Sequence, residues 1–363
     1  MPTYRAPGRA NLIGEHTDHS DGLVLPAAID RGVTLEIEPG GSRIVLTSLD
    51  AVGRVDIRAD GTDAPARGWG RYVAAVAAEL AALGRDPVGC RGEVRSDLPQ
   101  GAGLSSSAAL EVVIAIALCD VGGMTLSPLE MAAACRRAER RAVGVPSGIM
   151  DQAASLLGRA GHAVLLDCGT LDHRHVPLPS DHALLIVDSG VRRQLESSAY
   201  GQRTAELQSA LPVLDGRRPS DVDPAELDGL LDRLEDVPAR RLRHVVTENA
   251  RVLEAEAALK ADDLDRLGRI FAAGHASLRD DFEVSIPELD RLVELAGDAG
   301  ATAARMTGGG FGGAIIALAK RDRAESIGAR VLEAYARHHP DRTGAIHLCD
   351  AADGAGRVEG DIG

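Results

Sequence analysis

Aromatic side chains are scarce in this sequence, which has three phenylalanines, four tyrosines and one tryptophan among 363 residues. Proteins that hold sugars or single-stranded nucleic acid by stacking usually need more of them, so a bound sugar would be held by polar side chains. Basic residues are also outnumbered, since 40 Lys and Arg face 54 Asp and Glu and the formal net charge is −14. Nucleic acids and anionic membranes are bound through clustered Lys and Arg. We therefore expect neither as a partner.

The five cysteines form no C-x-x-C pair, and their odd number leaves no complete disulfide framework. This usage is typical of free thiols in a reducing compartment. Long apolar runs are missing as well, because the longest, 108–119, is interrupted by Glu111 and is too short to span a bilayer. The first residues carry no signal-peptide pattern. We predict a cytoplasmic protein.

Length and patterning together predict two domains with an α+β fold. A chain of 363 residues is long enough for two domains that each bury a core. Strand and helix patterns do not alternate strictly, which favours α+β over a doubly wound parallel sheet. The segment 169–180 is polar and holds two prolines, so we place the boundary there. The predicted domains are 1–176 and 177–363.

Periodicity predicts the individual elements. Alternating or continuous apolar residues predict strands at 33–38, 43–49, 55–58, 90–95, 161–168, 182–188 and 314–319, with the second and third forming a hairpin. A 3.6-residue period predicts helices at 69–83, 106–119, 127–143, 195–210, 224–235, 239–260, 262–277, 287–298 and 322–337. The third of these helices has the clearest start, because Ser127, Pro128 and Glu130 form a capping box. The segment after Cys349 is expected to be loosely ordered.

A loop rich in glycine and serine, Pro99 to Leu110 (PQGAGLSSSAAL), joins a predicted strand to a predicted helix. Small residues let backbone N–H groups approach a phosphate, and a helix N-terminus adds unpaired donors. Taken alone, the same letters also fit an ordinary serine-capped helix. The loop is not a P-loop, because no Lys-Ser/Thr pair ends it. It is not a Rossmann fingerprint either, because Ser106 stands where the third glycine belongs.

A second glycine cluster lies at Met306 to Leu318 (MTGGGFGGAIIAL). It contains G-x-G-x-x-G from Gly308 to Gly313, but an apolar strand pattern follows where a Rossmann helix should begin. Glycines at this density are typical of a tight loop whose backbone packs closely against a ligand or against another loop. The segment alone does not separate these two interpretations.

Polar residues gather near the N-terminus, within the segment 6–26. They are Arg9, Glu15, His16, Asp18 and His19. Such a cluster can hydrogen-bond the several hydroxyls of a sugar. The two histidines and Asp18 are also plausible metal ligands, and a solvated turn is the third interpretation.

Two further carboxylates stand out by position. Glu139 falls on the edge of the buried stripe of the helix 127–143, where a carboxylate needs a cation or hydrogen-bond donors. A neighbouring arginine is the ordinary partner. Asp151, in GIMDQAASLLG (148–158), stands at a predicted helix start, where an N-cap is the ordinary role.

Together these segments resemble the three ordered motifs of the GHMP kinases. The first, Gly8 to Asp18 (GRANLIGEHTD), resembles the galactokinase signature in particular. Three more segments are similar to galactokinases: GIMDQ at 148–152, SSAY at 197–200 and SLRDDFEVSIPELD at 277–290. The resemblance covers roughly residues 5–350.

The resemblance implies a two-domain GHMP kinase fold with the active site in the interdomain cleft, ATP and Mg²⁺ as cofactors, and phosphorylation of the anomeric C1 hydroxyl of galactose. It implies Asp151 as proton acceptor with Arg9 beside it. The sugar contacts would be Glu15, His16, Asp18, Gly148 and Tyr200. The ATP phosphates would be wrapped by Gly101, Ala102, Gly103, Leu104, Ser105, Ser106 and Ser107, and Trp69 and Tyr72 would line the adenine pocket. The Mg²⁺ ligands would be Ser107 and Glu139. We expect a monomer or weak homodimer whose partners are the sugar and ATP.

One departure from the family pattern lies beside the signature, where His19, Ser20 and Asp21 stand in place of the usual Tyr-Asn-Gly. Kinases of N-acetylgalactosamine or arabinose therefore remain alternatives. A sensor that binds sugar and ATP without chemistry is another, although known sensors resemble this family with residues missing from the serine loop, which is complete here. A metal hydrolase built on His16, Asp18 and His19 is the alternative from a different class.

Overall fold

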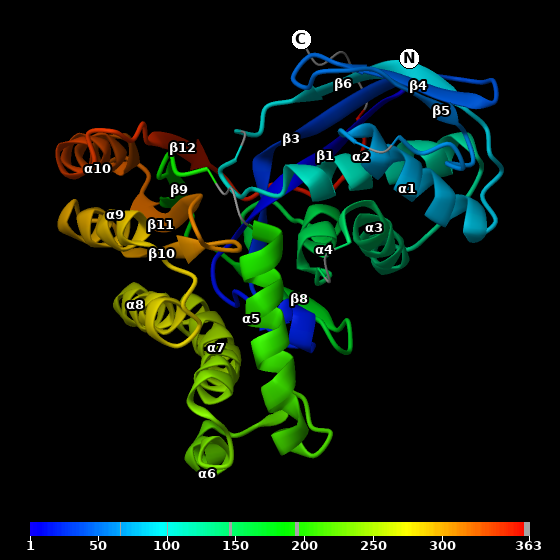
Figure 1. Cartoon of the computed structure of the whole chain (residues 1–363). Helices are drawn as coiled ribbons and strands as arrows, with labels where there is room; N and C mark the ends of the chain where they lie inside the picture. The colour runs from blue at the N-terminus through cyan, green and yellow to red at the C-terminus, as the bar shows by residue number, and fades with distance from the viewer. Residues whose placement is uncertain (66, 100, 145–146, 193–195, 359–363) are drawn as a thin grey trace.

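The chain folds into helices and strands arranged on three β-sheets (Figure 1), which confirms the predicted α+β class. The computed structural model describes residues 1–65, 67–99, 101–144, 147–192 and 196–358. Its strands are β1 (Thr3–Asn11), β2 (Leu23–Val24), β3 (Pro26–Pro39), β4 (Arg43–Ser48), β5 (Val55–Arg58), β6 (Cys90–Ser96), β7 (His162–Asp167), β8 (His173–Pro177), β9 (His182–Asp188), β10 (Ala303–Thr307), β11 (Ala314–Lys320), β12 (Ala345–Cys349) and β13 (Gly356–Val358).

The helices differ widely in length. The α-helices are α1 (Gly70–Ala82), α2 (Ser106–Val121), α3 (Pro128–Val143), α4 (Met150–Leu157), α5 (Glu196–Ala210), α6 (Leu227–Leu231), α7 (Asp236–Lys260), α8 (Leu264–Asp280), α9 (Pro287–Asp298) and α10 (Ala324–His338). Short 3₁₀ turns are η1 (Asp18–Ser20), η2 (Leu211–Leu214), η3 (Pro219–Asp221) and η4 (Pro224–Glu226). No helix in the described part of the chain is both long and apolar enough to cross a membrane.

The largest sheet has six strands in the order β13-β1-β3-β6-β4-β5, and α1 to α4 lie on one side of it (Figure 1). Helices α2 and α4 contact β1 and β3 directly, and α1 and α3 pack against α2. Helix α2 is apolar on most of its surface, which fits its place between the sheet and other helices. This sandwich fixes where α2 and α4 begin, and both beginnings form part of the site.

An irregularity in β1 directs Arg9 toward those helix starts. The pairing of β1 with β3 shifts register between Pro7 and Arg9. At that point the Arg9 N–H donates to the Leu104 carbonyl at 3.2 Å instead of continuing the ladder. Bulges of this kind re-aim side chains next to active sites. The strand thereby joins the sheet to the serine loop.

A second sheet, in the order β10-β11-β9-β12, is packed with α8, α9 and α10, and a small third sheet contains β2, β7 and β8. The main core cluster joins residues of the six-stranded sheet to residues of β9, α7 and α8, such as Ile186, Val252 and Phe271. Strand β13 also returns from the C-terminal part to pair with β1. The division into 1–176 and 177–363 stays a prediction.

Local sequence signals predicted most helices and the strands β3, β4, β5, β6, β7, β9 and β11, whereas β1, β2, β8, β10, β12 and β13 were not predicted. The β4–β5 hairpin and the Ser127–Glu130 capping box are confirmed. The segment 169–180, in which the predicted boundary falls, contains the strand β8, whose residue Val176 is fully buried. The prediction of a loosely ordered tail after Cys349 was wrong for residues 350–358, because β13 pairs with β1 of the large sheet, and residues 359–363 lie outside the described residues. Both strands are short; β8 pairs with the neighbouring β7, whereas β13 pairs with β1 at the other end of the chain.

Candidate active site

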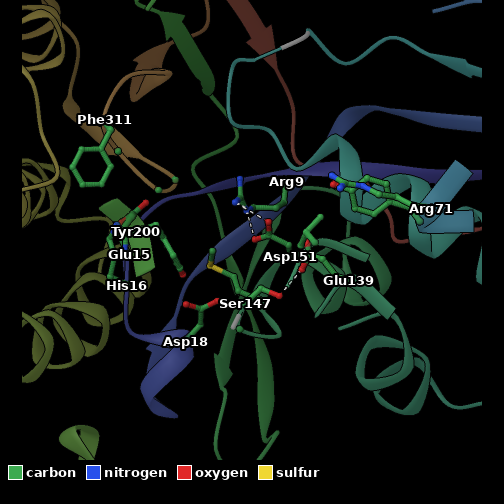
Figure 2. A pocket seen from close by; sticks show the side chains of 17 residues that line it. Arg9, Glu15, His16, Asp18, Arg71, Glu139, Ser147, Asp151, Tyr200 and Phe311 are labelled. Atoms are coloured by element: carbon green, nitrogen blue, oxygen red, sulfur yellow. Dashed lines mark hydrogen bonds and ion pairs between the residues drawn. The ribbon is translucent and has the colours of Figure 1, made fainter. Parts of the chain in front are cut away.

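The centre of the site is an ion pair between Arg9 of β1 and Asp151 in the first turn of α4. Arg9 Nε lies 2.8 Å from Asp151 Oδ1, and Arg9 Nη2 lies 3.0 Å from Oδ2. The third guanidinium nitrogen, Nη1, donates to the Gly103 carbonyl at 2.7 Å. Such a forked pair fixes both groups more rigidly than a lysine could. Figure 2 shows the two side chains facing one another across the site. Asp151 does not cap α4, since the N-cap position is Ile149.

The start of α2 faces a cavity of about 400 Å³. Ser105 holds the N-cap position in the left-handed region, at φ 58°, and makes no capping hydrogen bond. Its hydroxyl instead donates to Asp151 Oδ2. The first-turn N–H groups are therefore left open to an anion, where the helix dipole favours negative charge. A strained non-glycine residue at this point is typical of a functional site.

The same cavity is lined by nearly the whole serine loop and by residues of other elements. Its lining is Arg9, Pro99, Gly101, Gly103, Leu104, Ser105, Ser106, Ser107, Asp151, Arg192 and Gly309. Of the predicted phosphate-loop residues, Ala102 and Leu104 belong to the buried hydrophobic core, and only Ala102 is missing from the cavity lining. Gly101 has φ +80°, and a Cβ there would lie 2.0 Å from Arg192 Nη1. Glycine is thus required both by the backbone and by the close approach of that guanidinium.

A neighbouring cavity of about 590 Å³ contains the predicted sugar residues (Figure 2). Its lining is Arg9, Glu15, His16, Asp18, Arg71, Tyr72, Glu139, Val143, Ser147, Gly148, Met150, Asp151, Tyr200, Gly308, Gly309, Gly310 and Phe311. Arg9, Asp151 and Gly309 line both cavities. The ion pair therefore stands at the junction of the polar pocket and the cavity that the start of α2 faces.

Asp18 and Gly148 lie against one another in the lining of the polar pocket. A Cβ at position 148 would lie 1.9 Å from Asp18 Oδ2, so only glycine leaves room for that carboxylate. Burial raises the pKa of Asp18 to about 7, with Asp151 adding to the rise and Arg9 opposing it. A half-buried carboxylate with a raised pKa keeps an unmet need for donors. Sugar hydroxyls would supply them.

Replacing Asp18 by asparagine should stabilise the protein while weakening sugar binding. The carboxyl pKa rises from 3.8 to about 7 on folding, so the folded state binds the proton more tightly and its stability falls as pH rises between about 4 and 7. A shift of that size corresponds to at most about 4 kcal/mol, and because the group faces an open cavity we expect about 1–2 kcal/mol at pH 8. Thermal unfolding of wild type and Asp18→Asn at pH 4 and pH 8 measures this gain in stability. The gain should vanish at pH 4. Asp21→Asn, exposed on the same loop, is the control, and equal Asp18→Asn gains at both pH values would contradict the argument.

Glu15 is held by a fully buried charge cluster. Arg305 Nη2 lies 2.7 Å from Glu15 Oε2 and 2.7 Å from Glu248 Oε1. Burial raises the pKa of Glu15 to about 7, against the opposing charge of Arg305. Burial acts on Glu248 in the same sense, but the charges of Arg305 and Arg251 outweigh it and lower the pKa of Glu248. Removing one member would strand a buried charge, so the cluster ties the signature loop to α7 and β10.

His16 and Tyr200 form an aromatic wall of the polar pocket. Their ring centroids are 5.5 Å apart, and the His16 ring lies 4.6 Å from that of Phe282. His16 itself has φ 63°, another left-handed backbone at the site. His19, the first departing residue, does not line the cavity, and its ring meets that of Tyr200 edge-on at 5.9 Å. It thus reaches the pocket through Tyr200.

The predicted metal ligands lie in adjacent cavities, Ser107 in the smaller and Glu139 in the larger. Glu139 Oε2 accepts hydrogen bonds from Ser147 Oγ at 2.6 Å and from Gln152 Nε2 at 3.2 Å. Burial raises the pKa of Glu139. One carboxylate and one hydroxyl beside a phosphate pocket suit Mg²⁺, which takes few protein ligands and completes its shell with phosphates and water. No group of three or more His, Cys, Asp or Glu that could hold a metal ion occurs among the described residues, so the hydrolase site of His16, Asp18 and His19 is wrong.

Trp69 and Tyr72, the pair predicted to line the adenine pocket, do not line the same cavity. Tyr72 lines the larger cavity, with the Arg71 guanidinium 5.2 Å from its ring centroid. Trp69 lines neither cavity and packs against the hydrophobic core. Arg71, Arg192 and Arg305 are site residues that sequence reasoning missed. All three lie outside the N-terminal polar cluster; Arg71 directly precedes Tyr72, and Arg305 directly precedes the segment 306–318, whereas Arg192 had no such neighbouring signal.

Family comparisons agree with this geometry. The chain matches the galactokinase galactose-binding signature over residues 2–39, the GHMP kinases N terminal domain over 71–159 and the GHMP kinases C terminal domain over 255–337. A galactokinase of Roseiflexus sp. (strain RS-1) is 41% identical over 361 residues, which are 98% of this chain and 92% of that protein.

Solved structures give the same result. The Lactococcus lactis galactokinase complexed with galactose superposes with a TM-score of 0.93 at 32% identity, covering 98% of this chain and 95% of the other. The mevalonate kinase of L. major in complex with R-mevalonate shares the fold, with a TM-score of 0.67 at 20% identity and coverage of 97% and 96%. The chain belongs to the galactokinase family of the GHMP kinases.

Proposed function

We propose that this chain transfers the γ-phosphoryl group of ATP to the C1 hydroxyl of galactose, giving galactose 1-phosphate and ADP. The observation that carries the proposal is the position of Asp151, at the junction of the polar pocket and the open start of α2. A sugar hydroxyl in one cavity and a terminal phosphate in the other would meet at this carboxylate. The relatives, described as galactokinases, support the choice of sugar.

Asp151 is suited to orient the attacking hydroxyl and to take its proton. Its two oxygens already accept hydrogen bonds from Arg9 and Ser105, which hold the carboxylate in place. A strong base is not required, because a loose phosphoryl-transfer transition state needs little push from the nucleophile. Most of the acceleration would come from positioning and from electrostatic stabilisation of the phosphoryl oxygens.

The phosphates would be held by the first-turn N–H groups of α2 and by the Arg192 guanidinium on the opposite wall. These groups form the local positive site that a protein of net charge −14 needs for an anionic substrate. Ser107 and Glu139 would hold Mg²⁺, which supplies charge neutralisation of the phosphates when bound. Glu15, His16, Asp18 and Tyr200 would contact the sugar hydroxyls. We propose a cytoplasmic location, since all five cysteines are free and buried; a monomer or weak homodimer stays a prediction.

An ADP-release assay over a panel of sugars tests the proposal. Galactose should give the highest kcat/KM, by at least about tenfold over N-acetylgalactosamine, arabinose and glucose, because one unmatched polar group in such a pocket costs about 1–3 kcal/mol. Omitting Mg²⁺ should abolish turnover. Preference for another sugar would replace galactose as the substrate, and sugar binding without ADP release would identify a sensor.

A further inference from the structure

Glu111 is a fully buried carboxyl group that the proposed reaction does not use. It lies in the second turn of α2 and has 0% of its surface exposed. The titratable groups whose charges act on it or feel its charge are Tyr72 of α1, Cys135 and Glu139 of α3, and Asp151 of α4. None of these is a cation. A carboxylate left in this position would be a charge without compensation.

The side chain of Gln152 links Glu111 to Glu139. Gln152 Nε2 lies 3.0 Å from Glu111 Oε2 and 3.2 Å from Glu139 Oε2, so one amide nitrogen serves both carboxyl groups. Gln152 is fully buried as well. With acceptors on both sides, the orientation of the amide is determined: the nitrogen must face the two carboxyl groups.

Two oxygen atoms in this chain of contacts have no donor among the residues that the structure describes. They are Glu111 Oε1 and Gln152 Oε1, both buried. Both are acceptors if Glu111 is ionised, and neither can then satisfy the other. A single proton on Glu111 would make its Oε1 a donor, and Gln152 Oε1 is a buried acceptor on the side chain that Glu111 already contacts. Burial, followed by the charge of Glu139, raises the pKa of Glu111 to about 9, which places the proton there at neutral pH.

We propose that Glu111 acts as a neutral carboxylic acid that holds the Gln152 amide in the orientation in which its N–H fixes the Glu139 carboxylate. Glu111 is thus a positioning residue that acts on the phosphate and Mg²⁺ site through two hydrogen bonds. The inference rests on the proposed function at one point, the role of Glu139 as a Mg²⁺ ligand. Partners behind a metal ligand commonly change metal affinity by 10- to 100-fold when removed.

Two substitutions of Glu111 distinguish a protonated side chain from an ionised one. Glu111→Gln keeps the shape and one donor, so its Mg²⁺ concentration for half-maximal activity should stay within about threefold of wild type. Glu111→Met removes the hydrogen bond and should raise that concentration at least about tenfold. Gln152→Met removes the amide partner of Glu111 and should raise the Mg²⁺ concentration for half-maximal activity by a similar factor. A tenfold loss of activity in Glu111→Gln would overturn the inference, as would a wild-type Mg²⁺ requirement in Glu111→Met.

A measurement without metal or substrate tests the protonation state independently. A carboxyl group that is protonated when folded and ionised when unfolded lowers stability increasingly as pH rises from about 4.5 toward 9. Glu111→Gln removes that loss, so its Tm should exceed that of wild type by an amount that grows from pH 5 to pH 9. A Tm difference that is constant or falls with pH would overturn the inference. If wild type phosphorylates no sugar, the proposed function fails while this profile still decides the state of Glu111.

Discussion

Replacing Asp151 by asparagine should lower kcat by about 10²- to 10⁴-fold, the usual contribution of a positioned proton acceptor. Asparagine keeps the size of the side chain and one acceptor oxygen, so the sugar should still bind. It cannot accept the proton, and its amide nitrogen would meet the Arg9 fork, which approaches both oxygens at 2.8 and 3.0 Å. Steady-state kinetics with galactose and ATP, together with calorimetric titration of galactose, measure both effects.

The control for this variant is Asp172→Asn, which changes an exposed carboxylate that lines neither cavity. It should leave kcat unchanged and exclude a general effect of lost charge. Near-wild-type turnover by Asp151→Asn would contradict its role as proton acceptor. A loss of galactose affinity as large as the loss of kcat would contradict the expectation that Asp151 acts in catalysis and not in sugar binding. The carboxylate would then stabilise the bound ground state as much as the transition state.

The sequence predicted those parts of the site that lie in continuous segments. The serine loop and the glycine run each carry their backbone requirements within a dozen residues, so composition alone indicated a loop close to a ligand. The capping box at Ser127 was predictable for the same reason, since its hydrogen bonds join residues three apart.

Contacts between distant segments could not be predicted in this way. Arg305 stands in a short strand whose burial depends on Glu15 and Glu248, which are far from it in the chain. Arg192 follows β9 without any periodic pattern, and its place opposite Gly101 exists only in the folded chain. Glu111 looked like an interruption of an apolar run, whereas its partner Gln152 lies 41 positions away. Such residues owe their role to tertiary structure, which propensity and periodicity do not encode.

Replacing Arg9 by lysine should lower kcat by about 10²- to 10³-fold, comparable to the loss of one preorganised donor at a transition state. Lysine keeps the charge but not the fork, so it can satisfy one of the three acceptors that Arg9 serves, namely the two Asp151 oxygens and the Gly103 carbonyl. Because Gly103 belongs to the loop proposed to hold the ATP phosphates, the KM for ATP should rise together with the fall in kcat. Breaking this largely buried pair should also cost about 1–3 kcal/mol of stability, measured by denaturant unfolding.

The same strand offers a matched control in Arg5→Lys. Arg5 pairs with Asp97 at 2.9 Å, but both side chains are substantially exposed, and such surface pairs contribute about 0–1 kcal/mol. This variant should match wild type in activity and nearly in stability. Because Arg9 and Asp151 act as one unit, the double variant Arg9→Lys/Asp151→Asn should lose little more than Asp151→Asn alone. Losses that multiply in the double variant would mean that the two side chains act independently, and the coupling of sugar pocket and phosphate loop through this pair would be wrong.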